Sequence, residues 1–495
     1  MVMKTTRCLW VLALALSFAS LWADERSTAE RFERAKRSEP ELIAFLKQMP
    51  KGADLHNHVT GAIYSDFMLD HAVATGLHFN LKTTLFQREA GETTVPARQL
   101  QENWLYYRQF MYAVSMAGSF PAVKSGHDHF FDTFQYIGPA NTGRSSSDIL
   151  FEVIDRARAQ NIQYLELMTS VSPGPAYSAF MANLPSTKDL DEAHAALAPR
   201  LPALVEASVK FVEERDAEIS KRLGFDVFDP ASPTTVRYVF SANRLAENDA
   251  FFAQIMAGMA IAQASPRVVS LNIVAPEDFV TGRLNFERQM EMIDYLWRRY
   301  GQPPLTLHAG ELTLEISPFE TMRNRIRQTI VKGHAQRIGH GISIAWEDDL
   351  PGLLAMMRER RVAVEVCLTS NASILKAEGD RHPIHLYLEN GIPVTLNTDD
   401  EGVSRSNLTN EYVRAVRSYG FDYRQLKTFA RNALEYSFLP GEGLYRGSYD
   451  ALRPGFERVR DEDWTPDLDA REAMAGSQKL AAQVRLERAF VAFEK

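Results

Sequence analysis

An apolar run that changes abruptly into polar residues stands at Pro304-Leu-Thr-Leu-His308-Ala-Gly-Glu311. Its strand-type lead-in ends in a histidine, two small residues and a glutamate. The C-terminal end of a barrel strand suits this arrangement, because a side chain there can anchor a metal while a following carboxyl group faces whatever the metal holds. Three further stretches end in residues that bind metals or move protons: Asp54-Leu-His56-Asn-His58, Arg337-Ile-Gly-His340-Gly341 and Asn397-Thr-Asp399-Asp400.

Strand-like runs alternate with helical patterns through most of the chain. Eight runs have strand character: 53–56, 163–168, 236–241, 268–274, 305–308, 337–339, 362–367 and 393–397. Amphipathic helical patterns lie between several of them, at 147–160, 285–300, 321–331, 350–360 and 384–389. Alternating strands and helices indicate a parallel sheet, and eight such units indicate a closed barrel. The sequence therefore predicts an α/β fold, a (β/α)8 TIM barrel.

Two connections are too long for plain barrel loops. One follows the first strand at about 61–147, and the other follows the second strand at about 173–233, with a charged helical pattern at 204–223. We expect both to be helical insertions at the catalytic face, where they could cap a site. The predicted segments are a signal peptide at 1–23, a helical lead-in at 24–50, the barrel at 51–440 and a C-terminal helical extension at 441–495, with a surface helix at 471–493.

The first residues have the layout of a secretory signal. Lys4 and Arg7 precede an apolar core at 9–22, and Ser20-Leu-Trp-Ala23 is a suitable cleavage site. Because the core is too short to span a bilayer, we expect an exported protein, periplasmic or secreted, without a stable membrane anchor; an uncleaved anchor is the alternative. Cleavage would remove Cys8 and leave one thiol, and an exported chain without an internal disulfide suits a bacterial periplasm.

Composition and charge narrow the classes of partner. The chain has 495 residues, of which 45% are hydrophobic and 24% charged, so a large globular core is expected. A net charge of −8 argues against a nucleic-acid partner. The sequence leaves the oligomeric state open.

Four residues at predicted strand ends form a candidate metal site. His56 and His58 alternate along a strand, so both point to one face and can reach one ion. His308 and Asp399 end the fifth and eighth predicted strands, which can converge with the first across a barrel mouth. Three neutral imidazoles and one carboxylate suit zinc and leave room for a water, so we predict one Zn²⁺ per chain. For each residue taken alone, a hydrogen-bonded strand end is the alternative.

Acid–base residues accompany this set. Glu311 is predicted to be a proton donor and acceptor toward a substrate ring nitrogen, with stabilisation of the following helical turn as the alternative. His340, flanked by glycines, is predicted to hydrogen-bond an attacking water or to stabilise developing negative charge. Asp400 is predicted to contact another ring nitrogen. Glu365 and Cys367 alternate on the seventh strand and are interpreted as barrel interior rather than chemistry.

The order and context of these motifs resemble the adenosine deaminase family of metal-dependent amidohydrolase barrels. The motifs are His56-Asn-His58, His308-Ala-Gly-Glu311, Arg337-Ile-Gly-His340-Gly341 and Thr398-Asp399-Asp400, and the resemblance covers about 51–402. The long connections and the signal are similar to those of the exported, growth-factor-like deaminases. The resemblance implies zinc-dependent hydrolytic removal of the 6-amino group of adenosine, which gives inosine and ammonia.

The resemblance also implies roles for single residues. The zinc ligands would be His56, His58, His308 and Asp399. Glu311 would protonate N1 of the purine, His340 would orient the attacking hydroxide, and Asp400 would contact N7.

Departures from the family's pattern fall on what we expect to be the substrate side. Thr60 stands where an aspartate binds the sugar 5′-hydroxyl, and Glu401 stands where a proline is common. Ala275 stands where a glycine offers a backbone N–H to the purine, and it is followed by Pro276, which has no N–H. The predicted substrate-binding residues are Asp400, Gly310, Thr60 and Ala275.

A small-molecule purine nucleoside is therefore the expected partner, with alternatives left open. A deaminase of adenine, or of a modified or 5′-substituted adenosine, could use the same fold. A nucleoside-binding or signalling protein without catalysis is a second class. A metal-dependent hydrolase of esters or amides is a third, because the barrel hosts several chemistries.

Overall fold

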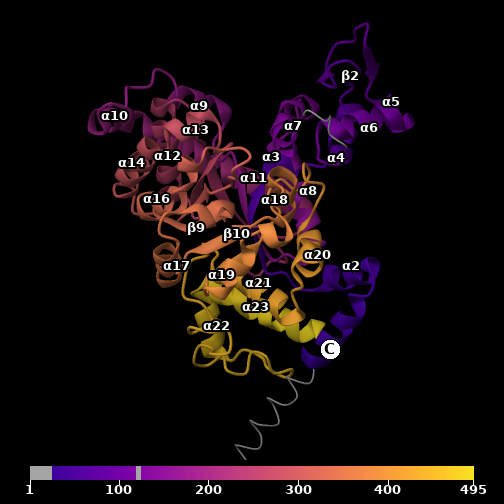
Figure 1. Cartoon of the computed structure of the whole chain (residues 1–495), viewed down its shortest axis with the longest axis vertical. Coiled ribbons are helices and arrows are strands. Elements are labelled where there is room, and N and C mark those ends of the chain that lie inside the picture. The colour runs from indigo at the N-terminus through magenta and orange to yellow at the C-terminus, as the bar shows by residue number, and fades with distance from the viewer. Residues whose placement is uncertain (1–24, 119–123) are drawn as a thin grey trace, which may run out of the picture.

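An eight-stranded parallel sheet forms the centre of the computed structural model, which describes residues 25–118 and 124–495 (Figure 1). The predicted signal peptide at 1–23 lies outside the described residues. The order in the sheet is β1-β5-β6-β7-β8-β9-β10-β11, and neighbouring strands run parallel. The strands are β1 (Ala53–His58), β5 (Tyr164–Thr169), β6 (Thr235–Asn243), β7 (Val268–Val274), β8 (Leu305–Ala309), β9 (Ala335–His340), β10 (Ala363–Val366) and β11 (Val394–Leu396).

Backbone hydrogen bonds between β1 and the residues after β11 close this sheet into a barrel. The N–H of His58 donates to the carbonyl of Asp399 at 3.1 Å, and the N–H of Asp399 donates to the carbonyl of His56 at 2.9 Å. Asn57 and Asp399 form a parallel bridge at the same place. The predicted TIM barrel is confirmed, and each predicted strand lies within two residues of the observed one.

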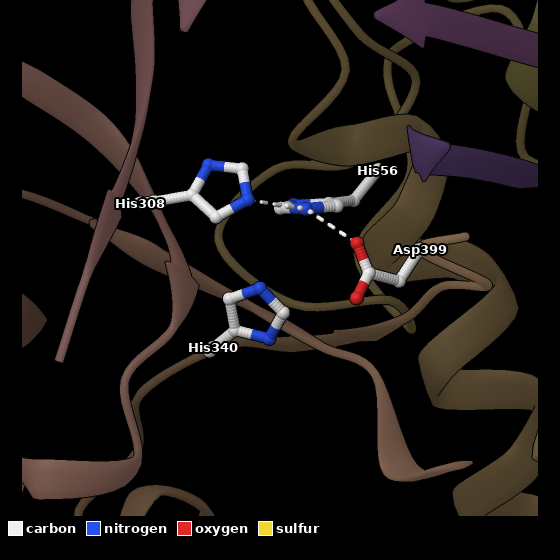
Figure 2. A group of neighbouring side chains, drawn as sticks. All are labelled: His56, His308, His340 and Asp399. Carbon is white, nitrogen blue, oxygen red and sulfur yellow. Dashed lines mark hydrogen bonds and ion pairs between the residues drawn. The ribbon is translucent and has the colours of Figure 1, made fainter. Parts of the chain in front are cut away.

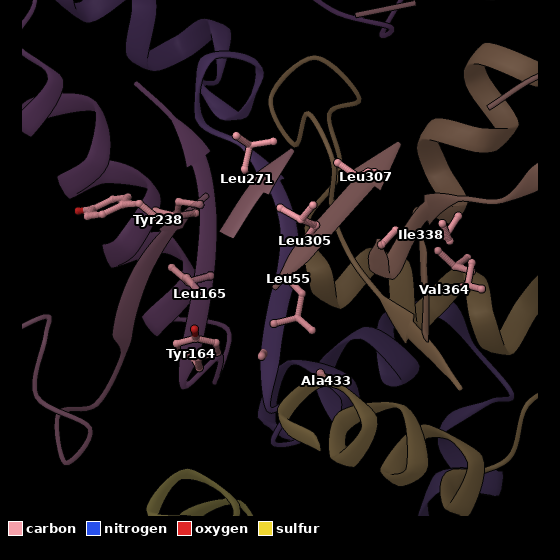
Figure 3. Packing of buried hydrophobic residues seen from close by; sticks show 14 of the residues in the cluster. Leu55, Tyr164, Leu165, Tyr238, Leu271, Leu305, Leu307, Ile338, Val364 and Ala433 are labelled. Carbon is pink, nitrogen blue, oxygen red and sulfur yellow. The ribbon is translucent and has the colours of Figure 1, made fainter. Parts of the chain in front are cut away.

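Each barrel strand is buried on both faces, but the two faces carry different chemistry. Apolar residues such as Leu55, Leu307 and Val364 belong to the core between the strands and the surrounding helices (Figure 3). The alternate residues carry the polar groups that meet inside the barrel: Thr306 and Arg337 both donate to Glu365. The alternation of strand side chains therefore places polar residues inside and apolar residues outside.

Helices surround the barrel and follow the strands in sequence. They are α8 (Ser146–Arg158), α12 (Asn248–Ala264), α13 (Val280–Leu284), α14 (Phe286–Trp297), α15 (Phe319–Met322), α16 (Arg325–Val331), α17 (Leu350–Glu359), α18 (Leu368–Leu375), α19 (Ile384–Glu389), α20 (Leu408–Tyr419) and α21 (Tyr423–Glu435), with 3₁₀ turns η2 (Ile342–Trp346) and η3 (Gly379–Arg381). Four of the five predicted helices are confirmed. The fifth, at 321–331, is wrong as one helix, because Asn324 leaves the helical conformation at φ −146° and separates α15 from α16.

The first insertion, residues 61–147, forms a separate lobe above the barrel (Figure 1). It contains α4 (Ser65–Ala74), α5 (Arg98–Glu102), α6 (Trp104–Ala113) and α7 (Gly126–Ala140), preceded by α3 (Val59–Ala62). It also contains a small antiparallel sheet, β3-β2-β4, of β2 (His78–Asn80), β3 (Phe86–Gln87) and β4 (Thr94–Pro96). The helical prediction is confirmed, and the small sheet was missed because strands of two or three residues leave too short a pattern to recognise.

The second insertion, residues 173–233, lies on the other side of the barrel (Figure 1). It comprises α9 (Gly174–Phe180), α10 (Leu190–Leu197), η1 (Ala198–Arg200) and α11 (Leu201–Leu223). The predicted charged helix at 204–223 is confirmed as the main part of α11. Gly224, at φ 78°, ends that helix in the left-handed conformation that glycine adopts without strain.

The two ends of the described chain pack together below the barrel. A helix at 25–35 precedes α2 (Glu39–Gln48), and the chain ends in α22 (Leu468–Ala475) and α23 (Gln478–Phe493). Thr28 donates to the carbonyl of Glu494 at 3.3 Å. The single surface helix predicted at 471–493 is wrong, because Ser477 caps a new helix and α23 buries Leu486 and Phe490. The predicted domain boundaries stay predictions.

Within 25–118 and 124–495, the structure has no helix that is both long enough and apolar enough to cross a membrane.

Candidate metal centre and active site

The nitrogen and oxygen atoms of four predicted ligands converge at the C-terminal mouth of the barrel. The Nε2 atoms of His56 and His308 are 3.1 Å apart, and that of His58 lies 3.3 Å from the first and 3.2 Å from the second. Oδ1 of Asp399 lies 3.5 Å from Nε2 of His56 and 3.4 Å from Nε2 of His58. Figure 2 shows His56, His308 and Asp399 facing one another, with His340 beside them. β1, β8 and the turn after β11 thus supply all four side chains.

These separations fit a tetrahedral metal. With metal–nitrogen bonds of about 2.0–2.1 Å, the donors of a tetrahedral site lie about 3.3 Å apart. Nitrogen donors at this separation, with the carboxylate oxygen nearby, match the donor set of a divalent transition metal. His340 also has a nitrogen within 4.8 Å of donor atoms of His56, His308 and Asp399, so distance alone admits it as a ligand.

Buried polar partners orient the ligands. Nδ1 of His56 lies 2.7 Å from Oε2 of Glu365, and Nδ1 of His308 lies 2.8 Å from Oδ1 of Asn272. Because these acceptors take the Nδ1 proton, each ring turns the lone pair of Nε2 toward the centre. Ser370 donates to Oδ2 of Asp399 at 2.5 Å and leaves Oδ1 for the metal.

Sequence reasoning missed these partners. Glu365 does lie in the barrel interior, as predicted, but its contact with His56 gives it a part in the site. Ser370 lies in α18, four residues after the end of β10, and Asn272 is an isolated amide in an apolar strand. A polar residue inside an otherwise apolar strand is the signal that could have identified Asn272.

Burial and charge set the protonation of the rings. Burial lowers the pKa of His58 to about 3 and holds the pKa of His308 well below its usual range, so both rings are neutral. Burial also lowers the pKa of His56, but Asp399 and Glu365 outweigh it and raise the pKa to about 10. A metal that binds His56 therefore has to displace a proton from this ring.

The predicted acid–base residues stand around the ligands with unused polar atoms. Oε1 of Glu311 is 3.7 Å from Nε2 of His340, and that nitrogen is buried without a protein partner among the described residues. Oδ1 of Asp400 is likewise buried and unpaired within the described chain. Burial and the charges of Asp399 and Glu277 raise the pKa of Glu311 well above its usual range. A protonated Glu311 is suited to donate a proton to a ligand.

Positive backbone φ angles mark several of the predicted site residues. Ala275 has φ 84°, His340 φ 65° and Asp399 φ 60°, and Gly310 has φ 79°. Non-glycine residues adopt this region at an energetic cost, and such residues cluster at functional sites. Each of the four stands at or just beyond the end of a barrel strand, where the chain turns and directs a side chain or an amide into the mouth.

The substrate-side residues have diverse surroundings. Thr60 is exposed on α3, directly after His58. Ala275 adopts a left-handed backbone conformation, at φ 84°, that glycine reaches without strain. The carbonyl of Gly310 accepts from the N–H of Ser343 at 2.9 Å, and a Cβ on Gly310 would stand 2.8 Å from Oγ of Ser343. Substrate binding by these residues stays a prediction.

Glu401 does not face the substrate side, which corrects our expectation. Its carboxylate is buried and accepts from Nη2 of Arg156 at 2.9 Å. Arg156 belongs to α8 and also donates to the carbonyl of Ala62 at 2.8 Å. The side chain therefore ties the turn after Asp400 to a barrel helix, because a buried carboxylate needs a charged partner.

Comparison with known proteins agrees with this geometry. The family model described as adenosine deaminase matches residues 120–445, a range that includes His308, Glu311, His340 and Asp399. The chain belongs to the adenosine deaminase family. Its members are metal-dependent, and the buried His/Asp cluster supplies a suitable site. His56 and His58 lie before the matched range, and the fold brings them to the other ligands.

Relatives in the family differ in the substrates that they are named for. An aminodeoxyfutalosine deaminase of Streptomyces coelicolor is 40% identical over 140 residues, which cover 28% of this chain and 33% of that protein. An adenosine deaminase of Enterococcus faecalis is 35% identical over 138 residues, covering 28% and 37%. The chain thus spans about a third of the length of the curated relatives that it matches.

Solved structures show the same fold. The N6-methyl-AMP deaminase of Arabidopsis thaliana superposes with a TM-score of 0.52 at 20% identity, over 80% of this chain and 94% of that one. An Arabidopsis structure in complex with GMP superposes equally, with a TM-score of 0.52 at 20% identity over 80% and 94%.

Proposed function

We propose that this chain is an exported, zinc-dependent adenosine deaminase that converts adenosine and water to inosine and ammonia. The convergence of His56, His58, His308 and Asp399 at separations of 3.1–3.5 Å carries the proposal, together with the unpaired polar atoms of His340 and Asp400. Three imidazoles and one carboxylate that gather at these separations suit zinc, which supports the choice of metal. A bound zinc would supply an activated water at neutral pH.

Other side chains of the site donate the proton and bind the attacking oxygen and the purine. Glu311, kept protonated by burial, gives its proton to N1 of the purine and so makes C6 more open to attack. His340, whose Nε2 lies 3.7 Å from Oε1 of Glu311, holds the attacking oxygen by a hydrogen bond. Asp400 meets N7 with its unpaired oxygen. Water then adds at C6, and the amino group leaves as ammonia.

Export rests on the first residues of the chain. The basic start at Lys4 and Arg7, the apolar core at 9–22 and the small residues before Asp24 support a cleaved signal. The single cysteine that would stay after cleavage, Cys367, is buried and unpaired, in keeping with a protein that needs no disulfide.

Ammonia release from a panel of nucleosides tests the proposal. The zinc-loaded protein should release ammonia from adenosine and form inosine in equal amount. Adenine, N6-methylated adenosine, AMP and 5′-substituted adenosines should be slower. If none of these compounds releases ammonia while zinc is bound, the purine assignment is wrong.

A second candidate substrate is an adenosine that is modified at its 5′ position. Thr60 is exposed and carries no carboxylate to bind a free 5′-hydroxyl, which favours this class. The relatives named for aminodeoxyfutalosine and N6-methyl-AMP show that family and fold serve more than one substrate. If Thr60→Asp raises kcat/KM for adenosine and lowers it for the 5′-substituted compounds, the 5′-substituted class is the better assignment.

A further inference from the structure

A buried chain of hydrogen bonds runs from the start of α19 to His340. The backbone N–H of Ile384 lies 3.1 Å from Nδ1 of His382. Nε2 of His382 lies 3.2 Å from Oδ1 of Asn371, and Nδ2 of Asn371 lies 3.0 Å from Nδ1 of His340. Asn371, His382 and His340 are at most 4% exposed, so water does not compete for these bonds.

The first bond fixes the direction of all the others. A backbone N–H can only donate, so Nδ1 of His382 accepts and its Nε2 carries the proton. Burial lowers the pKa of His382 to about 3, which keeps the ring neutral. Nε2 of His382 therefore donates to Oδ1 of Asn371, and the amide turns its NH₂ toward His340. Because this NH₂ can only donate, Nδ1 of His340 accepts and the proton of His340 sits on Nε2.

We propose that Asn371 and His382 are positioning residues that hold His340 as its Nε2–H tautomer, so that His340 offers the reaction site a hydrogen-bond donor and neither a base nor a metal ligand. The tautomer follows from the hydrogen bonds alone, and its part in the reaction rests on the proposed deaminase function.

The tautomer removes His340 from the candidate metal ligands that distance alone allows. His340 lies close enough to His56, His308 and Asp399 to complete a site in place of His58. A ligating nitrogen needs its lone pair free, and Nε2 of His340 carries a proton. His58 therefore completes the site, with its Nε2 atom 3.2–3.4 Å from the other donors.

The tautomer also decides what His340 does in the reaction. Its Nε2–H has no protein partner in the described chain and lies 3.7 Å from Oε1 of Glu311. An N–H at this place stabilises the attacking oxygen by a hydrogen bond and takes no proton from it. Proton transfer is thereby left to Glu311.

A second contact holds the backbone of His340 independently of this chain of hydrogen bonds. The hydroxyl of Tyr387, also on α19, donates to the carbonyl of Gly341. The turn that carries His340 at φ 65° is thus fixed by Tyr387, while Asn371 fixes the proton. A change at Asn371 should alter the tautomer with little movement of the ring.

The tautomer can be measured without turnover, by ¹⁵N NMR of zinc-loaded protein labelled at histidine. The resonances of His340 are assigned from their loss in His340→Gln. The proposal expects a protonated, pyrrole-type Nε2 and an unprotonated Nδ1. An unprotonated or zinc-bound Nε2 in the wild-type protein overturns it. Since this readout needs no substrate, an Nε2–H tautomer in a protein that deaminates no nucleoside would refute the proposed function and leave the tautomer standing.

Asn371→Asp tests whether the tautomer of His340 controls the rate. A carboxylate of the same shape can only accept hydrogen bonds, so it draws the proton of His340 onto Nδ1. We expect kcat to fall on the order of 100-fold, with KM and zinc content unchanged, since a wrong tautomer at a catalytic imidazole costs at least that much. Full activity of Asn371→Asp with a switched tautomer would overturn the proposal.

Paired variants at His382 keep the test valid should Asn371→Asp fold poorly. His382→Leu removes the donor to Asn371 and should lower kcat, whereas His382→Gln restores an N–H at that position and should recover most of it. His385→Gln, at an exposed position three residues later in the first turn of α19, is the matched control and should leave kcat unchanged. Equal activities of His382→Leu and His382→Gln would contradict the role of His382 in orienting Asn371.

Discussion

The barrel interior and the first insertion, residues 61–147, are held together by different interactions. Inside the barrel, Arg337 pairs with both Glu166 and Glu365, and Glu365 in turn holds His56 at 2.7 Å. The insertion has an apolar core instead, in which the ring centroids of Phe86 and Phe110 are 4.9 Å apart. Satisfied networks of buried hydrogen bonds rigidify the groups that they join, whereas apolar packing tolerates rearrangement.

This difference between the two regions explains why the metal ligands lie in the barrel and not in the insertion. Ligands of a metal need fixed positions, so they stand at the ends of strands that a buried network holds on every side. The apolar core of the insertion continues into the barrel mouth, where it includes Ile342, Ile374 and Val403. An ion pair between His127 of α7 and Asp278 after β7, 3.0 Å apart, adds to this contact. The variants below test this contrast, beginning with the greatest expected effect.

His308→Ala should abolish metal binding and activity. It removes a ligand whose Nε2 lies 3.1 Å from that of His56, so the remaining donors cannot complete the coordination of the metal. Turnover should fall by about 1,000-fold or more, because the metal is worth several kcal/mol in the transition state. Zinc content by atomic emission and ammonia release measure both effects. A variant that keeps stoichiometric zinc would remove His308 from the ligand set.

Phe110→Ala should loosen the insertion and leave the metal centre intact. The Phe110 side chain is fully buried, and its truncation should cost about 3–5 kcal/mol of local stability. Trp104→Ala on the same helix is the control, because Trp104 is 60% exposed and should change stability by about 0.5 kcal/mol or less. Hydrogen exchange of the α6 amides measures both. A drop in zinc affinity in Phe110→Ala would show that the two regions are not independent.

Glu311→Gln should keep zinc and lose activity on the order of 100-fold or more, since a positioned acid–base group contributes at least that factor. The amide retains the shape of the side chain but cannot deliver a proton. Kinetics with zinc content measured on the same sample separate this outcome from that of His308→Ala. Unchanged turnover would remove Glu311 from its role.

The metal ligands could be predicted from the sequence, but the residues that orient the site could not. His56, His58, His308 and Asp399 were identifiable because each ends a strand-like run, and strand ends of a barrel meet at one mouth. Asn371 and His382 were not, because they gain meaning only from the position of His340, which lies 31 residues before Asn371 in the chain. The pairing of Glu401 with Arg156, 245 residues away, was hidden in the same way. Each ligand can be recognised from the residues around it in the sequence. The residues that orient the ligands can be recognised only from the fold.

Glu365→Gln should weaken zinc binding by about 10–100-fold without removing a ligand, because the partner of a metal-binding histidine tunes its basicity and orientation. The carboxylate accepts from Nδ1 of His56, and an amide accepts more weakly. Competition with a chelator measures the affinity. Cys367→Ala is the control, because this buried thiol alternates with Glu365 along the chain and its hydrogen bond goes to the backbone carbonyl of Glu365. Equal affinities of Glu365→Gln and wild type would exclude the orienting role.

The smallest expected effect concerns pH and the contact between the two regions. The pKa of His127 is raised, because its bonds to Asp278 and Asp128 outweigh burial, which lowers it. Its charged form therefore stabilises the contact fully below the unfolded pKa of about 6.5, and this contribution is lost as pH rises through the folded pKa. Exchange of the α7 amides, corrected for intrinsic rates, should be faster at high pH. Asp278→Asn should remove most of this pH dependence, and its persistence would assign the effect to other groups.

The most direct test of the central claim is a titration of metal-free protein with zinc, followed by ammonia release from adenosine. The account predicts that activity rises in proportion to added zinc and reaches its plateau at one zinc per chain, with inosine and ammonia formed in equal amounts. Activity that is already complete without zinc, or none at one zinc per chain, would contradict it.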